Sequence, residues 1–297
     1  MTFFSPTSSP TRRTALLLGL APVLAACSPS LETFNSITPK DDHTRVARRN
    51  VRFGPERRHT LDVYAPEEAV ENAPVMAFFY GGGWMWGDKD EYEFVGRAFA
   101  AQGFVTVVPN YRLAPHVHFP AFVEDCALAL KWIAENIARH GGDPKRLALS
   151  GHSAGAYNAV MLALDPRFAE AAGFDLGAVK GVAAMAGPYD FLPLRHDFTI
   201  QAFSGAPDLE ETQPARFARA GAPPLLLMWG AKDDLVGRQN IETLERAMRE
   251  AGGAVESKIY PDLNHGEILL ALSVPLRDIA PVLQDIVDFA KRVTASG

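Results

Sequence analysis

The stretch Gly151-His152-Ser153-Ala154-Gly155 decides how the rest of this sequence is interpreted. A short apolar run typical of a strand, residues 146–149, precedes it, and residues 156–164, rich in helix formers, follow it. The pattern Gly-x-Ser-x-Gly therefore lies where a strand turns sharply into a helix, which is the context of a nucleophile elbow. Glycines at both ends lack a Cβ, so the strand and the helix can approach closely around the serine. A glycine-rich turn without chemistry is the alternative, and other residues must decide between the two.

The composition and charge restrict the class of protein. The chain has 297 residues, 47% of them hydrophobic, which suits one large α/β domain better than two small ones. The formal net charge is −6, and the basic pairs Arg48-Arg49 and Arg57-Arg58 do not extend into a basic block. This charge distribution argues against a nucleic acid as partner.

Apolar runs and helical patterns alternate along the chain after residue 50. We predict strands over residues 75–80, 104–109, 146–149, 179–186, 224–229 and 255–260. We predict helices over residues 92–102, 119–138, 156–164, 239–251 and 281–293, and an edge hairpin from residues 51–53 and 60–64. Strands that alternate with helices form right-handed βαβ units, so we expect an α/β fold with a mostly parallel sheet and helices on both faces. Cys126 falls on the apolar stripe of its helix, which indicates a buried core thiol.

Three reactive residues follow three different predicted strands. They are Ser153, Asp233 and His265, and the order Ser, Asp, His along the chain is that of the α/β-hydrolase triad. Because chemistry in parallel sheets gathers beyond the carboxyl ends of the strands, we expect these side chains to meet. Asp234 and Asp190 remain alternatives for the acid. The other seven histidines, among the eight in the chain, lack a matching position after a strand.

The chemistry explains why these residue types are needed together. A serine hydroxyl is a poor nucleophile until an imidazole takes its proton, which is the role we assign to His265. Asp233 would fix the tautomer of that imidazole and stabilise its protonated form. The tetrahedral intermediate carries an oxyanion, and we expect the backbone amides of Gly82, Gly83 and Ala154 to stabilise it.

Several motifs together resemble the hormone-sensitive-lipase-like and related carboxylesterase branch of the α/β-hydrolases. They are Tyr80-Gly81-Gly82-Gly83-Trp84, Asn110-Tyr111-Arg112-Leu113-Ala114-Pro115, Phe119-Pro120-Ala121 and Gly151–Gly155, with Gly230-x-x-Asp233-x-x-Val236 and His265 similar to the acid and base motifs. The resemblance covers about residues 51–293 and implies ester hydrolysis without a cofactor or metal. Two features depart from the family pattern: Tyr80 stands where His is usual, and the short, polar residues 28–50 offer no N-terminal helical cap.

The first 26 residues have the features of an export signal. Arg12-Arg13 precede the apolar run 15–26, which is too short to span a bilayer comfortably. The run ends in Leu24-Ala25-Ala26-Cys27, which resembles a bacterial lipobox. We therefore expect Cys27 to carry a lipid that anchors the exported protein to a membrane of the bacterial cell envelope. An ordinary cleaved signal is the alternative, and the choice between Sec and twin-arginine export stays open.

These patterns divide the chain into three parts. Residues 1–26 are the expected export signal, residues 27–50 a polar tether, and residues 51–297 a catalytic α/β-hydrolase domain. Within that domain, residues 187–221 lack a steady periodicity and are expected to form a small cap over the site.

The expected activity is hydrolysis of a small-molecule carboxylic ester through an acyl-enzyme on Ser153. An amidase or formamidase of the same fold is the near alternative. A non-catalytic binding protein is the distant one, although the presence of all three triad residue types argues against it. We expect Trp84, Trp86 and Phe203 to bind substrate, and the two tryptophans to shorten the acyl pocket so that short acyl chains are preferred.

Overall fold

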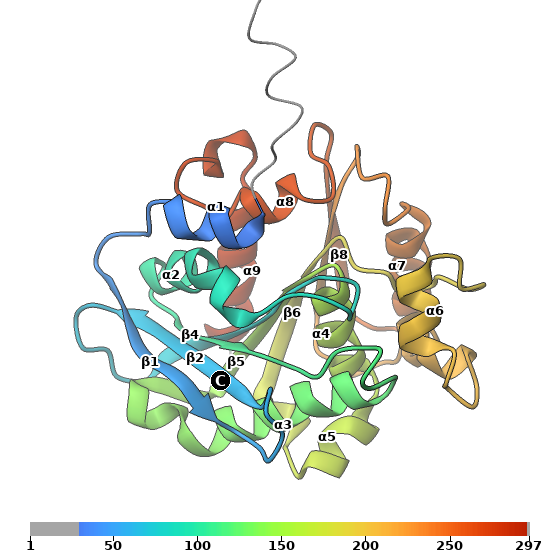
Figure 1. Ribbon diagram of the computed structural model, residues 1–297, viewed down its shortest axis with the longest axis horizontal. Coiled ribbons are helices and arrows are strands. Elements are labelled where there is room, and N and C mark those ends of the chain that lie inside the picture. The colour runs from blue at the N-terminus through green and yellow to red at the C-terminus, as the bar shows by residue number, and fades with distance from the viewer. Residues whose placement is uncertain (1–29, 296–297) are drawn as a thin grey trace, which may run out of the picture.

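A single eight-stranded sheet organises the structure, a computed structural model that describes residues 30–295 (Figure 1). The strands follow the order β1-β2-β4-β3-β5-β6-β7-β8 across the sheet. The pairs β1–β2 and β2–β4 are antiparallel, and every other neighbouring pair is parallel. The strands are β1 (Thr44–Arg52), β2 (Thr60–Pro66), β3 (Ala73–Phe79), β4 (Val105–Pro109), β5 (Gly142–His152), β6 (Val179–Met185), β7 (Leu225–Gly230) and β8 (Val255–Tyr260).

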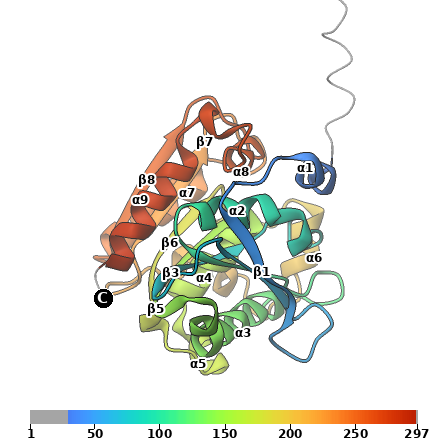
Figure 2. The same cartoon turned by 90° about the vertical axis from the view of Figure 1, so that its left-hand side faces the viewer.

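Helices cover both faces of the sheet, with α2 and α9 on one face and α3 and α4 on the other (Figures 1 and 2). The helices are α1 (Leu31–Ile37), α2 (Glu93–Ala101), α3 (Ala121–Asn136), α4 (Ala154–Leu164), α5 (Pro166–Ala172), α6 (Asp197–Phe203), α7 (Gln239–Glu250), α8 (Glu267–Leu270) and α9 (Val282–Ala295). Close packing demands glycine in places. A Cβ on Gly181 of β6 would come within 2.9 Å of the Phe289 ring on α9.

The expected fold class is confirmed: the sheet is mostly parallel and each predicted strand is present. The apolar stripe predicted for α3 faces the core, and Cys126 on that stripe is fully buried. The predicted edge hairpin is also present, but its first strand begins at Thr44 rather than at residue 51. The polar residues of β1 point outward from the edge of the sheet, so they do not give the apolar run that marks a buried strand.

The predicted polar tether is wrong from Leu31 onward. Helix α1 begins there, with the Ser30 hydroxyl accepting a hydrogen bond from the amide of Thr33. Its Phe34 ring packs edge-on against Phe94 of α2, with the ring centroids 5.5 Å apart. The predicted export signal at residues 1–26 and the predicted lipid site at Cys27 lie outside the described residues.

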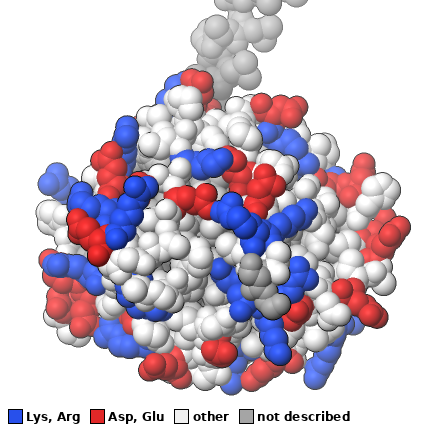
Figure 3. Space-filling model, turned by 180° about the vertical axis from the view of Figure 1, so that it is seen from behind, with Lys and Arg blue, Asp and Glu red and all other residues white. Residues whose placement is uncertain are grey.

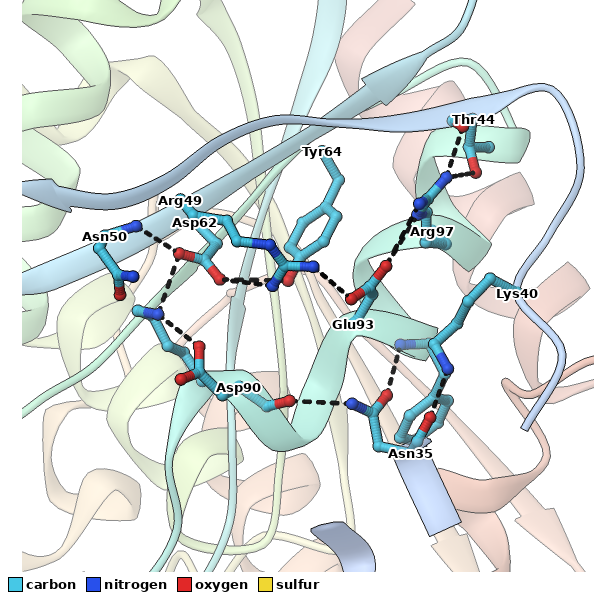
Figure 4. A network of polar contacts seen from close by, with 12 residues as sticks. Asn35, Lys40, Thr44, Arg49, Asn50, Asp62, Tyr64, Asp90, Glu93 and Arg97 are labelled. Atoms are coloured by element: carbon cyan, nitrogen blue, oxygen red, sulfur yellow. Dashed lines mark hydrogen bonds and ion pairs between the residues drawn. The ribbon is translucent and has the colours of Figure 1, made fainter. Parts of the chain in front are cut away.

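A buried charge pair fastens this N-terminal segment to the sheet (Figure 4). The Lys89 ammonium lies 3.0 Å from the Asp62 carboxylate on β2, and both side chains are almost completely buried. The same carboxylate accepts a hydrogen bond from the backbone amide of Asn50 on β1. Next to Lys89, the backbone carbonyl of Asp90 accepts a hydrogen bond from the side chain of Asn35 on α1. One network thus fixes α1, β1 and β2 relative to one another.

The surface carries charges of both signs. Figure 3 shows lysine, arginine, aspartate and glutamate interspersed over the rear face, without a large patch of either sign. Within residues 30–295, no helix has the length and apolar character needed to span a membrane.

We expect Lys89→Met to destabilise the protein by about 3 kcal/mol, because it removes the buried cation from Asp62 and leaves that carboxylate only the exposed guanidinium of Arg49, 3.7 Å away. Urea denaturation would measure the free energy of unfolding. Arg292→Met is the matched control, since it breaks the ion pair of Arg292 with Glu256, in which both side chains are exposed. That loss should be below about 1 kcal/mol. Equal effects of the two substitutions would contradict the importance of the buried pair.

Candidate active site

Ser153 lies at the sharp turn between β5 and α4. Its backbone has φ 54° and ψ −121°, a left-handed φ that is rare for a residue with a side chain. The Ser153 amide donates to the carbonyl of Met185 at the end of β6, which holds the turn against the sheet. The flanking glycines are required sterically. A Cβ on Gly155 would lie 2.0 Å from the Phe79 carbonyl oxygen, and one on Gly151 would lie 2.5 Å from the Gly155 backbone.

The structure brings the three predicted reactive side chains together. His265 Nε2 lies 3.0 Å from Ser153 Oγ, and His265 Nδ1 lies 2.7 Å from Asp233 Oδ2. The other carboxylate oxygen of Asp233 accepts hydrogen bonds from the amides of Leu235 and Val236, each at 2.9 Å. This is the connectivity of a Ser-His-Asp triad.

The environment of Asp233 keeps its carboxylate ionised. Burial alone would raise the pKa of Asp233, but the hydrogen bond and charge of His265 together with the two amides outweigh burial and lower it. The alternative acids Asp190 and Asp234 are both exposed, and it is Asp233 that contacts His265.

His152 makes a contact that the sequence did not predict. Its Nε2 lies 2.8 Å from the backbone carbonyl oxygen of His265, and the two rings are 4.8 Å apart. Burial, followed by the proximity of His265, lowers the pKa of His152 to about 3, so the ring is neutral and can donate to that carbonyl. His152 thus connects the nucleophile turn to the loop that carries the base.

The predicted oxyanion donors lie on two elements that meet beside Ser153. Gly82 and Gly83 follow β3 with φ of 116° and 58°, and Ala154 is the first residue of α4. Glycine is needed at the first position because a Cβ there would lie 2.3 Å from the Trp86 carbonyl oxygen. Within residues 30–295, the amides of Gly82, Gly83 and Ala154 have no hydrogen-bond acceptor, which leaves them free to bind a developing oxyanion.

Trp84 lies in the cavity lining, where it was predicted, and it also supports the glycine loop. Its indole is buried and its Nε1 donates to Asn158 Oδ1 on α4 at 3.1 Å. Its backbone has φ 58°, and its carbonyl accepts a hydrogen bond from Ala114. Phe203, also predicted to bind substrate, is fully buried against Trp84 with ring centroids 4.7 Å apart and is not part of the cavity wall.

A cavity of about 970 Å³ opens over Ser153 and His265. The cap segment predicted over residues 187–221 supplies part of its wall, through Phe191 and Phe198 among others. Helix α1 supplies another part through Leu31 and Phe34, whereas a polar tether was predicted for this segment. Trp86 lines the cavity as predicted and is exposed. Within residues 30–295, no group of three or more metal-ligating side chains is positioned to hold an ion.

Tyr80, which stands where the resembling family usually has His, supports the glycine loop from behind. Its ring is buried and stacks on Tyr111 with centroids 4.7 Å apart. The Tyr80 hydroxyl donates to Asn110 Oδ1 and accepts from Arg58, while its carbonyl accepts from the Tyr111 hydroxyl. Tyr80 is not among the cavity-lining residues, so it acts on the loop and not on substrate.

Comparison with known proteins identifies the family of this chain. The sequence model of the BD-FAE family matches residues 61–248. The chain belongs to the BD-FAE family. A solved structure titled as a hyperthermophilic esterase from the archaeon Pyrobaculum calidifontis superposes with a TM-score of 0.71 at 25% identity, covering 88% of each chain. The protein therefore has the α/β-hydrolase fold of these esterases.

Curated proteins similar to this chain carry esterase names. Esterase LipQ of Mycobacterium tuberculosis is 29% identical over 267 residues, which cover 82% of this chain and 63% of that protein. A probable isoprenylcysteine alpha-carbonyl methylesterase of rice is 28% identical over 244 residues, which cover 75% of this chain and 57% of that protein. The chain thus spans about three fifths of the length of these relatives.

The Trp84–Asn158 hydrogen bond joins the glycine loop to α4, so it should fix the two sets of oxyanion donors relative to each other. We expect Trp84→Phe and Asn158→Leu each to lower kcat by about 10- to 100-fold with little change in KM. The double variant should be no worse than the poorer single variant, because both changes break one bond. Steady-state kinetics on a soluble ester would test this double-mutant cycle.

Tyr157→Phe is the control for that cycle. It removes a buried hydrogen bond, from the Tyr157 hydroxyl to the Thr212 carbonyl, on the residue next to Asn158. It should lower stability and leave kcat unchanged. Additive losses in the double variant, or an equal loss of kcat in Tyr157→Phe, would contradict the role given to the Trp84–Asn158 bond.

The buried, neutral His152 should make the protein sensitive to acid. Because its pKa is about 3 in the folded protein and about 6.5 when unfolded, its contribution to stability is complete above about pH 6.5 and is lost as the pH falls toward 3. Between pH 6.5 and pH 5 this group alone should remove about 2 kcal/mol. In His152→Gln the amide can still donate to the His265 carbonyl but does not titrate, so that loss should disappear. Denaturation at both pH values measures it, and an identical drop in both proteins would contradict the prediction.

Proposed function

We propose that the protein is a serine hydrolase that cleaves carboxylic esters. The observation that carries this proposal is the hydrogen-bonded series Ser153–His265–Asp233 at the base of the cavity, beside free amides of Gly83 and Ala154. Relatives named as esterases and carboxylesterases support it.

The geometry gives each residue a step in the reaction. Ser153 Oγ attacks the ester carbonyl carbon while His265 Nε2, 3.0 Å away, takes the hydroxyl proton. The carbonyl oxygen becomes an oxyanion bound by the free amides of Gly82, Gly83 and Ala154. His265 then returns the proton to the leaving alcohol, and the acyl group stays on Ser153. A water molecule that His265 deprotonates releases the acid, while Asp233 stays ionised and orients the imidazole throughout.

An export signal and lipid anchor complete the proposal. The sequence Leu24-Ala25-Ala26-Cys27 supports cleavage before Cys27 and attachment of a lipid to its thiol. The enzyme would then act in the bacterial cell envelope as a membrane-anchored lipoprotein. The intact mass of the mature protein tests this, since a lipid adds a defined mass to a chain that begins at Cys27.

A fluorophosphonate should label the peptide that contains Ser153 and no other. Ser153→Ala should abolish labelling because the phosphonate needs the activated hydroxyl. Asp233→Asn should lower kcat by about 10⁴-fold, since the imidazole then takes the wrong tautomer. Asp234→Asn is the matched control, an exposed neighbour that makes no contact with His265, and should leave kcat unchanged. Undiminished labelling of Ser153→Ala would refute the proposed mechanism.

We expect short acyl esters, from acetate to hexanoate, to be the best substrates. Trp86 lines the cavity and, of the three side chains expected to shape the pocket, is the one with an exposed ring. Trp86→Ala should therefore shift the preferred acyl chain to longer lengths. Trp84→Ala should instead lower kcat at every length, because its indole holds the glycine loop. Values of kcat/KM for p-nitrophenyl esters from acetate to palmitate measure this, and a best substrate longer than octanoate would contradict it.

A further inference from the structure

Exposed apolar side chains surround the mouth of the active-site cavity. Trp86 and Leu235 line the cavity and are 61% and 43% exposed. Large apolar groups gathered around one opening mark an interaction surface, whereas single scattered ones do not. We define the apolar rim as Trp86, Leu235 and Ile37, the last of which lies on α1.

Helix α1 brings the beginning of the described chain to this rim. Leu31 and Phe34 line the cavity, and Ile37, one further turn along the helix, is 71% exposed. Residues three apart lie on the same side of a helix, so this side of α1 runs from the cavity wall to the solvent. Figure 1 shows α1 beside α8, whose Leu269 and Leu270 line the same cavity. The chain therefore enters the folded domain at the cavity mouth.

The expected anchor lies close to this point along the chain. Cys27 precedes Leu31 by four residues. Even a fully extended chain spans at most about 3.6 Å per residue, so the two residues can be at most about 14 Å apart. A lipid on Cys27 would therefore hold the cavity mouth close to the bilayer. The connection is too short for the opposite side of the molecule to face the bilayer instead.

We propose that the apolar rim docks on the surface of a lipid bilayer, with the cavity mouth facing the lipid. The proposal rests on the lipid attachment at Cys27 proposed above. A tryptophan with one apolar and one polar edge suits the boundary between lipid and water, and Trp86 is exposed and lines the cavity. The lipid fixes only the end of the chain, so contact between the rim and the bilayer is what would set the orientation of the domain. Esters dissolved in the bilayer would then reach Ser153 without first entering water.

The fluorescence of Trp86 can test this orientation. The mature lipidated protein would be incorporated into vesicles of phosphatidylcholine, with or without bromine atoms on the acyl chains, since bromine quenches a nearby indole. The chain has four tryptophans, and Trp86→Phe identifies the share of the emission that comes from Trp86. We expect brominated lipid to quench the wild type and to leave Trp86→Phe unchanged. Equal wild-type emission in both kinds of vesicle overturns the proposal.

A matched pair of substitutions tests the rim without using activity. Ile37→Glu places a charge on the rim, whereas Ile259→Glu places one at an apolar position on β8 that is 42% exposed and outside the cavity lining. Quenching should fall in Ile37→Glu and stay at the wild-type level in Ile259→Glu, while both variants keep their thermal unfolding midpoints. Equal quenching in the two variants, or an intact mass showing an unmodified Cys27, overturns the proposal. Turnover of a soluble ester, measured in the same samples, reports separately on the proposed hydrolase function.

Discussion

The left-handed backbone of Ser153 is the constraint on which the whole site depends. A residue with a side chain adopts φ 54° only when its surroundings impose it. Here the imposing contacts are the hydrogen bond from the Ser153 amide to Met185 on β6 and the close packing at Gly151 and Gly155. The turn exposes the hydroxyl at the carboxyl edge of the sheet, where the loops after β7 and β8 bring Asp233 and His265 to it.

Two side chains next to that turn extend its influence to the rest of the site. His152, immediately before Ser153, holds the backbone of the base through the His265 carbonyl. Asn158, one helical turn after it, holds the glycine loop through the Trp84 indole. The nucleophile, the base and the oxyanion donors are therefore all positioned from a single segment, the end of β5 and the beginning of α4. The relative positions of these catalytic groups are therefore not set by several loops that move independently.

The sequence was sufficient to predict the strands of the sheet and the reactive residues that follow them. It was insufficient to predict which residues line the cavity. The three catalytic residues could be predicted because each follows a strand whose apolar run can be recognised from the sequence alone. They are Ser153, Asp233 and His265. The position of Phe203 was predicted wrongly, because the exposure of an aromatic side chain depends on which neighbouring residues cover it. Helix α1 was missed because its stability comes from Asn35 and Phe34 contacting residues more than fifty positions away, not from a local helical pattern.

The position of α1 has a practical meaning for where this domain begins. The segment that the family model matches, residues 61–248, contains neither α1 nor His265. A protein limited to those residues would lack the catalytic base His265 and the part of the cavity wall that α1 supplies. Asn35 donates a hydrogen bond to the Asp90 carbonyl, and the Asn50 amide of β1 donates one to Asp62. Trimming the N-terminus even to Val51 would remove both contacts and would also expose the buried Lys89–Asp62 ion pair to water. Crystallisation or expression clones should therefore start no later than Ser30.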